Sequence, residues 1–386
     1  IDLCIVDTSG RARDIDVTML WRSELCPGWL DTRADQPDAI AAIGTAVGAS
    51  DLTGPWWVAC GSLSRPTAVD LNLTSPEHVT GNGAAAGQRF RVSVPANGET
   101  LLRLGAHGAA HSVDDAITAL HGILYDAGRI VEAKRARLDA TLSLSRLDVP
   151  DGNIVRAWVW TRCAYDWLVR DVPGVGRGLG AGLPEYPWWF SCDSCYALRG
   201  LLPQGGFEIA EETLRLLATA SEQHNGATGR IIHELSCTGH VFNPGNTQET
   251  PQFACAVLEA YLWSGRRALV DDLYPLCRAG VLSWTLGTCD QDGDVLPEGY
   301  GITEVAGLNT EMIDSAVWTH EALRAVGRMA TLVGDGQTAA RCAILAPRVR
   351  SAIERHFWQE DDGMYADWVA TPRQALPRLE QMLSSR

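Results

Sequence analysis

The stretch LPEYPWWFSCDSCYALRGLLP, residues 183–203, joins an aromatic cluster to an acid and to the start of a helix. The aromatic run WWF at 188–190 comes shortly before Asp193. Flat aromatic rings suit the apolar faces of sugars, and a nearby carboxyl group can hydrogen-bond hydroxyls or transfer protons. The pattern also has a purely structural interpretation, in which Asp193 caps a helix over 193–202 and the tryptophans fill the core.

Helical periodicity dominates the chain from Ser112 onward. Ser112 and Asp115 resemble a capping box, and apolar residues then recur at helical spacing. The predicted helices span 112–146, 152–170, 193–202, 206–224, 251–264, 266–286, 310–333 and 335–358. Long loops separate them at 171–192, 225–250 and 287–309, and loops of this length are usually functional or disordered. We expect helical hairpins around a common axis, with the three loops at one end.

Residues 1–107 have the signals of β-structure instead. Short alternating runs are broken by Gly, Pro and Asn, as at 90–94, where apolar residues occupy every second position. The turn PANG at 95–98 follows, and alternation resumes at 101–104, which predicts a hairpin. The predicted architecture is therefore mainly α with an N-terminal β domain, namely a β-sandwich over 1–107 and an (α/α)6 toroid over 112–386.

Composition limits the classes of partner. The chain has 386 residues, a formal net charge of -15 and 46% hydrophobic residues. The negative charge argues against nucleic acid and anionic membranes, and no apolar run of about 18 residues predicts a membrane span. Eleven scattered cysteines suit free thiols in a reducing compartment, so we expect a cytoplasmic protein. The chain begins within the strand-like IDLCIVD. Two questions therefore stay open: whether the N-terminus is truncated and whether the protein is secreted.

The second loop concentrates hydrogen-bonding side chains. In the stretch GRIIHELSCTGHVFNPGNTQETPQF, residues 229–253, they are Arg230, His233, Glu234, His240, Asn243, Asn246, Gln248 and Glu249. Such a set suits a polyhydroxylated ligand that presents many donors and acceptors. A solvated surface loop is the alternative, because polar loops are common.

A zinc site in this loop is not expected. Residues 233–237, HELSC, nearly match the H-E-x-x-H helix, but Cys237 replaces the second histidine. The single C-x-x-C at 192–195 has no matching second pair, and the chain lacks the βαβ context of a redox motif. We therefore expect no metal here.

The third loop, CDQDGDVLPEGYGITEVAGLNTEMID at 289–314, is rich in acids. Its D-x-D-G-D run at 290–294 lacks the full twelve-residue calcium pattern and is interpreted as a polar turn. Glu298 and Glu304 lie among glycines and are better candidates for substrate contact. No phosphate-binding glycine motif is present, so we expect neither metal nor organic cofactor.

Taken together, the three loops resemble the six-hairpin glycosidases, especially the amylo-1,6-glucosidase domain of glycogen-debranching enzymes and related α-glucosidases. The resemblance rests on Trp189-Phe190-x-x-Asp193 and on LRGL at 198–201, which match that family's segment with its acid. It continues through Gly229-Arg230, His233-Glu234, Glu249-Thr250-Pro251, Phe253, Asp292-Gly293 and Pro297-Glu298-Gly299. It covers residues 112–370. Cys192 departs from the pattern, because debranching relatives commonly have Arg before the acid.

The resemblance implies a closed barrel of twelve helices, whereas about eight are counted here. Either this chain omits a C-terminal portion or this member has lost part of the barrel. Since an open barrel exposes apolar helix faces, we expect a C-terminal segment or a partner, such as another copy in a homo-oligomer, to complete it. The family's catalytic base lies in a late loop, so the base is left unassigned here, and a place outside this chain is one alternative. Glu249 is a weak candidate for it.

The predicted function is an inverting glycoside hydrolase that cleaves α-glucosidic linkages in oligosaccharides or glycogen-like substrates. Asp193 is the predicted general acid, kept protonated by an apolar wall of Tyr186, Trp188 and Trp189. The predicted substrate-binding residues are Tyr186, Trp188, Trp189, Phe190, Arg230, His233, Glu234, Gln248, Glu249, Glu298 and Glu304. Two alternatives stay open, namely a sugar epimerase that uses His233 or His240 as its base and a non-catalytic carbohydrate-binding protein.

Overall fold

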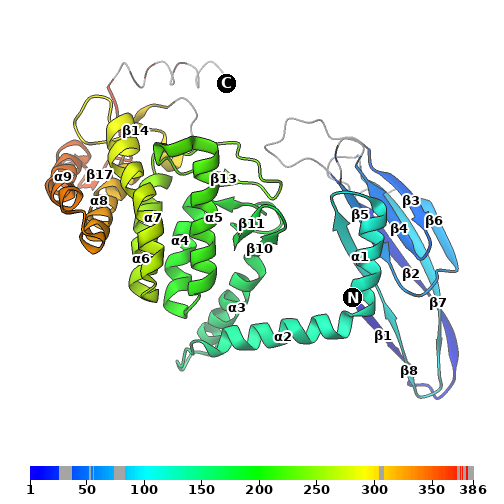
Figure 1. The fold of residues 1–386 in the computed structure, drawn as a ribbon. Coiled ribbons are helices and arrows are strands. Elements are labelled where there is room, and N and C mark those ends of the chain that lie inside the picture. Colours follow the sequence, from blue (N-terminus) through cyan, green and yellow to red (C-terminus); the bar gives the residue numbers. More distant parts are fainter. Residues whose placement is uncertain are drawn as a thin grey trace. The chain divides into compact units, whose positions relative to one another are not determined.

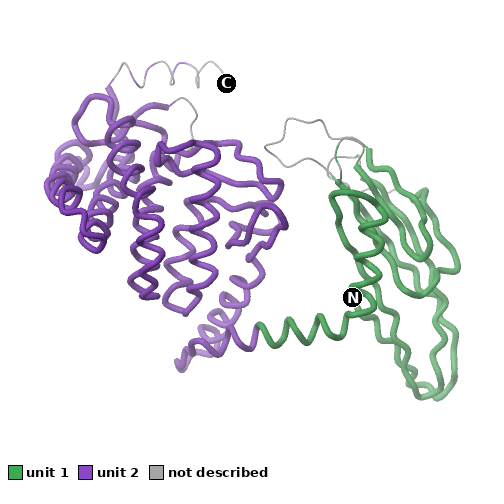
Figure 2. The backbone as a smooth tube through the Cα atoms, in the orientation of Figure 1, with its two compact units in different colours: residues 1–137 green, residues 138–386 purple. Residues whose placement is uncertain are grey.

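The computed structural model describes residues 1–25, 37–51, 54, 56–73, 83–303, 308–371, 374, 376 and 380. The chain divides into two compact units, which we call the N-terminal unit (residues 1–137) and the helical unit (residues 138–386) (Figure 2). Among the described residues, no helix has both the length and the apolar character needed to cross a membrane.

The N-terminal unit consists of antiparallel sheets and one packed helix. The strands are β1 (Asp2–Val6), β2 (Arg13–Ser23), β3 (Ala39–Ile43), β4 (Ala46–Ser50), β5 (Trp57–Gly61), β6 (Ala68–Leu73), β7 (Ala84–Val94), β8 (Glu99–Arg103) and β9 (Gly105–Ala109). They form sheets of order β2-β7-β6, β3-β4-β5-β9 and β1-β8. The buried side chain of Gln88 on β7 donates to the Thr45 carbonyl at 3.1 Å, which links the first sheet to the turn between β3 and β4 of the second.

The predicted hairpin around residues 95–98 is wrong in its pairing. The turn forms, with the Gly98 N–H donating to the Pro95 carbonyl at 3.1 Å. However, β7 pairs with β2 and β6, whereas β8 pairs with β1. The inward residues of both strands still share one core cluster, which includes Phe90 and Leu102. Alternation therefore located both strands, but a turn sequence does not determine which strand pairs with which.

The predicted helix over 112–146 is two helices, α1 (Val113–Tyr125) and α2 (Ala127–Ser143). The Ser112 hydroxyl accepts from the Asp115 N–H at 3.0 Å, which confirms the predicted start of α1. The apolar face of α1 packs on β4 and β5, where Leu120 meets Ala46 and Ala59 in one buried cluster. By this packing α1 belongs to the N-terminal unit, although its periodicity groups it with the helices that follow.

The helical unit is built from hairpins. After α3 (Gly152–Leu168), its helices are α4 (Ser191–Leu201), α5 (Phe207–Asn225), α6 (Glu249–Ser264), α7 (Arg267–Ala279), α8 (Ile313–Val333) and α9 (Gly336–His356). Short 3-10 turns lie at Leu202–Gln204, Gly226–Thr228 and Gly301–Thr303. Short strands lie in the connections: β10 (Val169–Val172), β11 (Gly176–Leu179), β12 (Trp189–Phe190), β13 (Glu234–Leu235), β14 (Glu298–Gly299), β15 (Thr310–Met312), β16 (Trp358–Gln359), β17 (Met364–Tyr365) and β18 (Trp368–Val369).

The hairpins α4/α5, α6/α7 and α8/α9 stand side by side (Figure 1). Helix α6 packs against both α4 and α8, so these three helices form one row. Helices α5 and α7 pack against this row and against each other. One continuous core fills the space between them, with residues such as Leu214, Phe253 and Met329 fully buried. The predicted helix over 266–286 is α7 followed by a π-helix at Gly280–Cys289, and the other predicted helices agree with the observed ones to within a few residues.

Candidate active site

The three long loops meet at one end of the helical hairpins. Strand β12 of the first loop pairs with β13 of the second, and the Ser191 N–H donates to the His233 carbonyl at 2.8 Å. The second and third loops together line one cavity, described below. The labels β13 and β14 mark this end in Figure 1. The prediction that the loops cluster is therefore confirmed.

Asp193 lies in the first turn of α4 and is exposed. The helix begins at Ser191 and its N-cap is Phe190, so the interpretation of Asp193 as the cap is wrong. A carboxylate in a first turn interacts favourably with the positive end of the helix dipole. Its neighbours Cys192 and Ser194 are buried, so Asp193 is the side chain that this turn presents to solvent.

Three helices of the row have an acid in the first turn, namely Asp193 on α4, Glu249 on α6 and Asp314 on α8. All three acids lie near enough to the thiol of Cys192 for their charges to act on it. Burial raises the pKa of Cys192 to about 12, and the negative charges of Glu249, Asp193 and Asp314 also raise it. The tertiary structure thus brings the three acids to the same end of neighbouring helices.

Asp314 was not predicted as a site residue. Burial raises the pKa of its carboxyl group, although the Ile302 N–H donates to Oδ2 at 3.0 Å. The backbone at Gly301, with φ +47°, lies so close that a Cβ there would be 2.7 Å from Oδ1 of Asp314. Its signal in the sequence was an acid near the start of a predicted helix, as Asp193 is near the start of α4.

The aromatic residues of the first loop divide between the two faces of β12. The Trp188 ring stacks on Phe190 at 6.3 Å and on Phe242 at 5.4 Å, and the edge of Tyr186 meets Phe190 at 6.0 Å. Trp189 is fully buried in the helical core, because successive side chains of a strand point to opposite faces. The predicted wall is therefore corrected: Phe242 and Phe190 join Tyr186 and Trp188, and Trp189 lies outside it.

Glu249 is the centre of a buried polar network. Its Oε1 lies 2.6 Å from Nδ1 of His233 and accepts from Nε2 of Gln248 at 3.0 Å, while Oε2 accepts from the Asn246 N–H at 2.6 Å. Burial raises the pKa of Glu249, and His233 and these hydrogen bonds oppose that shift. Since its side chain is fully buried, Glu249 is placed to anchor the loop rather than to touch a ligand.

The buried carboxylate of Glu234 joins two parts of the same loop by hydrogen bonds. Its Oε1 accepts from the N–H groups of Phe242 at 2.8 Å and Asn243 at 2.6 Å. Burial raises the pKa of Glu234, which these two bonds oppose. The carboxylate therefore holds the turn that carries Phe242 into the aromatic wall. His240, by contrast, is exposed beside Phe242.

A cavity of about 330 Å³ lies between the second and third loops. Its lining residues are Arg230, Gly245, Asn246, Thr247, Trp284, Thr288, Cys289, Gln291, Glu298, Gly299, Tyr300, Leu308 and Asn309. The Arg230 guanidinium lies 4.5 Å from the centre of the Trp284 ring, and Oε2 of Glu298 accepts from the Gln291 N–H at 2.7 Å. Burial raises the pKa of Glu298. The predicted contact Glu304 lies outside the described residues.

Gly245 is expected to be essential for the shape of this cavity. It has φ +118°, and a Cβ there would lie 1.9 Å from the Ile231 carbonyl oxygen. Gly245→Ala should therefore lower the free energy of unfolding by about 1–3 kcal/mol from backbone strain, with the clash adding to it. Urea unfolding measures the effect. The control is Gly336→Ala, where nothing lies within 4 Å of the new methyl group. Equal stability of the two variants would contradict this role.

Solved structures with the same kind of fold are found. A bacterial glucoamylase solved with acarbose matches with TM-score 0.53 and 11% identity, over 84% of this chain and 49% of its own. A protein described as a kojibiose phosphorylase from human microbiome matches with TM-score 0.53 and 11% identity, over 95% of this chain and 54% of its own. A GH78-family rhamnosidase of Bacillus sp. GL1 matches with TM-score 0.51 and 12% identity, over 97% of this chain and 34% of its own.

These proteins have (α/α)6-barrel glycosidase-type folds, and the present chain shares that kind of fold. The chain spans about half the length of the first two proteins and a third of the third. No protein-family model matches the chain, and no curated protein does. At this level of identity the likeness establishes the fold and leaves the reaction to the chemistry of the site.

Proposed function

We propose that this chain is the glycosidase-type part of a carbohydrate-active enzyme and that it hydrolyses α-glucosidic linkages. The observation that carries the proposal is that Asp193 and Asp314 lie at the same end of α4 and α8, the two helices that pack against α6. An aromatic wall and a cavity whose lining includes Arg230 and Glu298 lie in the loops of the same end. Carboxylates, aromatic rings and many hydrogen-bonding groups together suit a sugar.

In this proposal Asp193 is the general acid, as the resemblance to debranching enzymes implies. Asp314 is our candidate for the second carboxylate, which activates water on the opposite face of the sugar. Burial raises the pKa of Asp314, and a more basic carboxylate is a better proton acceptor near neutral pH. Inversion requires the two carboxyl groups to be about 6.5–9.5 Å apart, with room for the water between them.

The remaining polar residues fall into two groups. Arg230 and Glu298 line the cavity and are proposed to hydrogen-bond sugar hydroxyls. His233, Glu234, Gln248 and Glu249 are buried and hold the second loop in place. We propose that this second group acts on the substrate only by positioning the loop. Tyr186, which is exposed, is proposed to offer the apolar face on which a sugar ring stacks, while Trp188 is buried within the wall.

The epimerase alternative requires a histidine base that reaches the substrate. His233 is 8% exposed and its Nδ1 contacts Glu249, so its position suits a structural role better than proton abstraction. His240 is exposed but lies at the edge of the aromatic wall. The geometry therefore favours hydrolysis over epimerisation.

A panel of glycosides tests the function. The chain is incubated with α-1,4- and α-1,6-linked gluco-oligosaccharides, an aryl α-glucoside and an aryl α-rhamnoside, with and without inorganic phosphate, and products are followed by proton NMR. We expect β-glucose as the first product from α-glucosides without phosphate, since inversion changes the anomer. Release that depends on phosphate, a C-epimer of the substrate, or binding without turnover would each contradict hydrolysis and identify a different activity.

A further inference from the structure

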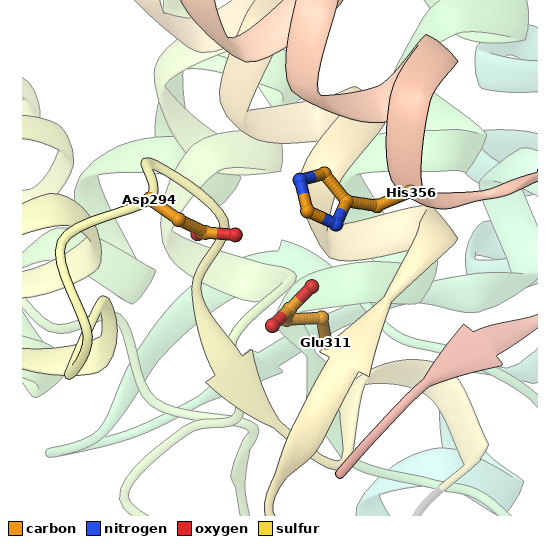
Figure 3. A group of neighbouring side chains, drawn as sticks. All are labelled: Asp294, Glu311 and His356. Carbon is orange, nitrogen blue, oxygen red and sulfur yellow. The ribbon is translucent and has the colours of Figure 1, made fainter.

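Asp294, Glu311 and His356 form a cluster that the proposed reaction does not use. One ligand-type atom from each residue lies within 4.8 Å of the others. Figure 3 shows the three side chains converging from separate elements: Asp294 from the loop before β14, Glu311 from β15 and His356 from the last residue of α9. Because these elements are distant in the sequence, the cluster is a product of the tertiary fold.

The surroundings of Glu311 carry an excess of negative charge. Glu311 lies where four other carboxyl groups, those of Asp294, Asp292, Glu298 and Asp290, act on its charge. Across the described part of the chain, the salt bridges include none from Arg or Lys to these five carboxyl groups. Such crowding of like charges is unfavourable unless a proton or a cation compensates it.

The three aspartates of the turn at 290–294 differ in the hydrogen bonds that their carboxyl oxygens accept. Oδ1 and Oδ2 of Asp290 accept from the Gly293 and Val295 N–H groups, and Oδ1 of Asp292 accepts from the Asp294 N–H. These bonds build the polar turn that the sequence predicted. In Asp294 only Oδ1 is occupied, by the Leu296 N–H at 2.8 Å, which leaves Oδ2 for another partner.

We propose that Asp294, Glu311 and His356 bind a divalent transition-metal cation, of which Mn²⁺ or Zn²⁺ has the matching preference for carboxylate and imidazole ligands. Water completes the coordination, since His356 is exposed. The donor set suits Ca²⁺ poorly, because calcium takes six to eight oxygen ligands. The proposal adds a metal where the sequence predicted none, and it does not depend on the glycosidase proposal.

The cation would join three elements behind the cavity. The loop that carries Asp294 continues into Glu298, which lines the cavity, and Glu298 lies opposite Glu311 in the β14–β15 pair. The metal would thus fix the third loop against β15 and the end of α9. Its role is structural, in that it holds one wall of the candidate active site.

The test uses Mn²⁺ alone as the probe, because thiolates, which favour softer metals, compete less for it. The full chain is dialysed against chelator and titrated with Mn²⁺, and bound metal is measured by electron paramagnetic resonance. Hydrogen exchange of residues 289–300 with and without Mn²⁺ gives a second readout. We expect one bound Mn²⁺ per chain and slower exchange in this segment.

Variants assign the ligands. Glu311→Gln and His356→Gln should each weaken Mn²⁺ binding by at least about 100-fold, since loss of even an outer partner of a metal site costs about 10–100-fold. Asp362→Asn, an exposed carboxylate between β16 and β17, should have no effect. Unchanged binding in either ligand variant, or no stoichiometric Mn²⁺ in the unmodified chain, overturns the proposal. Loss of binding in Asp292→Asn with full binding in His356→Gln would also overturn it, because the three-aspartate turn would then be the site.

Discussion

Asp193→Asn should lower turnover of an unactivated α-glucoside by about two to four orders of magnitude, the usual contribution of a positioned acid–base group. The fold should be nearly unchanged, because Asp193 is exposed and in the first turn of α4. Loss of its charge there removes at most about 1 kcal/mol of favourable interaction with the helix dipole. Steady-state kinetics with urea unfolding of the same sample separates the two effects.

Two comparisons make this result specific. Glu208→Gln neutralises an exposed acid in the first turn of α5 and should leave turnover unchanged. Asp314→Asn should abolish activity on every substrate, whereas Asp193→Asn should lose much less on an aryl glucoside with a good leaving group, which needs little protonation. If the two aspartates show the opposite pattern, Asp314 is the acid and our assignment is reversed. Near wild-type turnover by Asp193→Asn on all substrates would end its catalytic role.

His233→Ala should lower the free energy of unfolding by about 3–5 kcal/mol at neutral pH, the usual cost of removing the partner of a buried carboxylate. Glu249 is fully buried, and His233 is its contact at 2.6 Å. Without the imidazole, the carboxylate keeps only hydrogen bonds to neutral groups. Urea unfolding of both proteins measures the loss, and His224→Ala, an exposed histidine at the end of α5, is the control.

The deficit of His233→Ala should also depend on pH. Burial raises the pKa of Glu249 above its ordinary value of about 4.3. A carboxyl group with a raised folded pKa contributes stability that is fully present below its unfolded pKa and is lost as pH rises through the folded pKa. The difference between variant and wild type should therefore shrink as pH falls toward about 4. A difference that is the same at pH 4 and pH 7 would show that the imidazole contributes packing rather than charge.

Local signals in the sequence were enough to find most of the elements. The capping box at Ser112, the apolar periodicity of α5, α8 and α9, and the alternation in β7 each depend on neighbours within a few residues. Such patterns report burial on one face of an element, so they gave the β-rich beginning, the helical remainder and the three long loops. The sequence also showed directly which loops carry clusters of aromatic and hydrogen-bonding side chains.

Partners across the fold were decided only by tertiary packing. The turn at 95–98 gave no sign that β7 and β8 enter different sheets, since the apolar residues of both strands belong to one core cluster. Asp314 came to lie at the same end as Asp193 only because α8 packs beside α6, and Glu249 is buried against His233 only because of the same packing. The sequence thus determined which side chains were available, while long-range packing determined which carboxyl groups face solvent, which are buried, and which lie together.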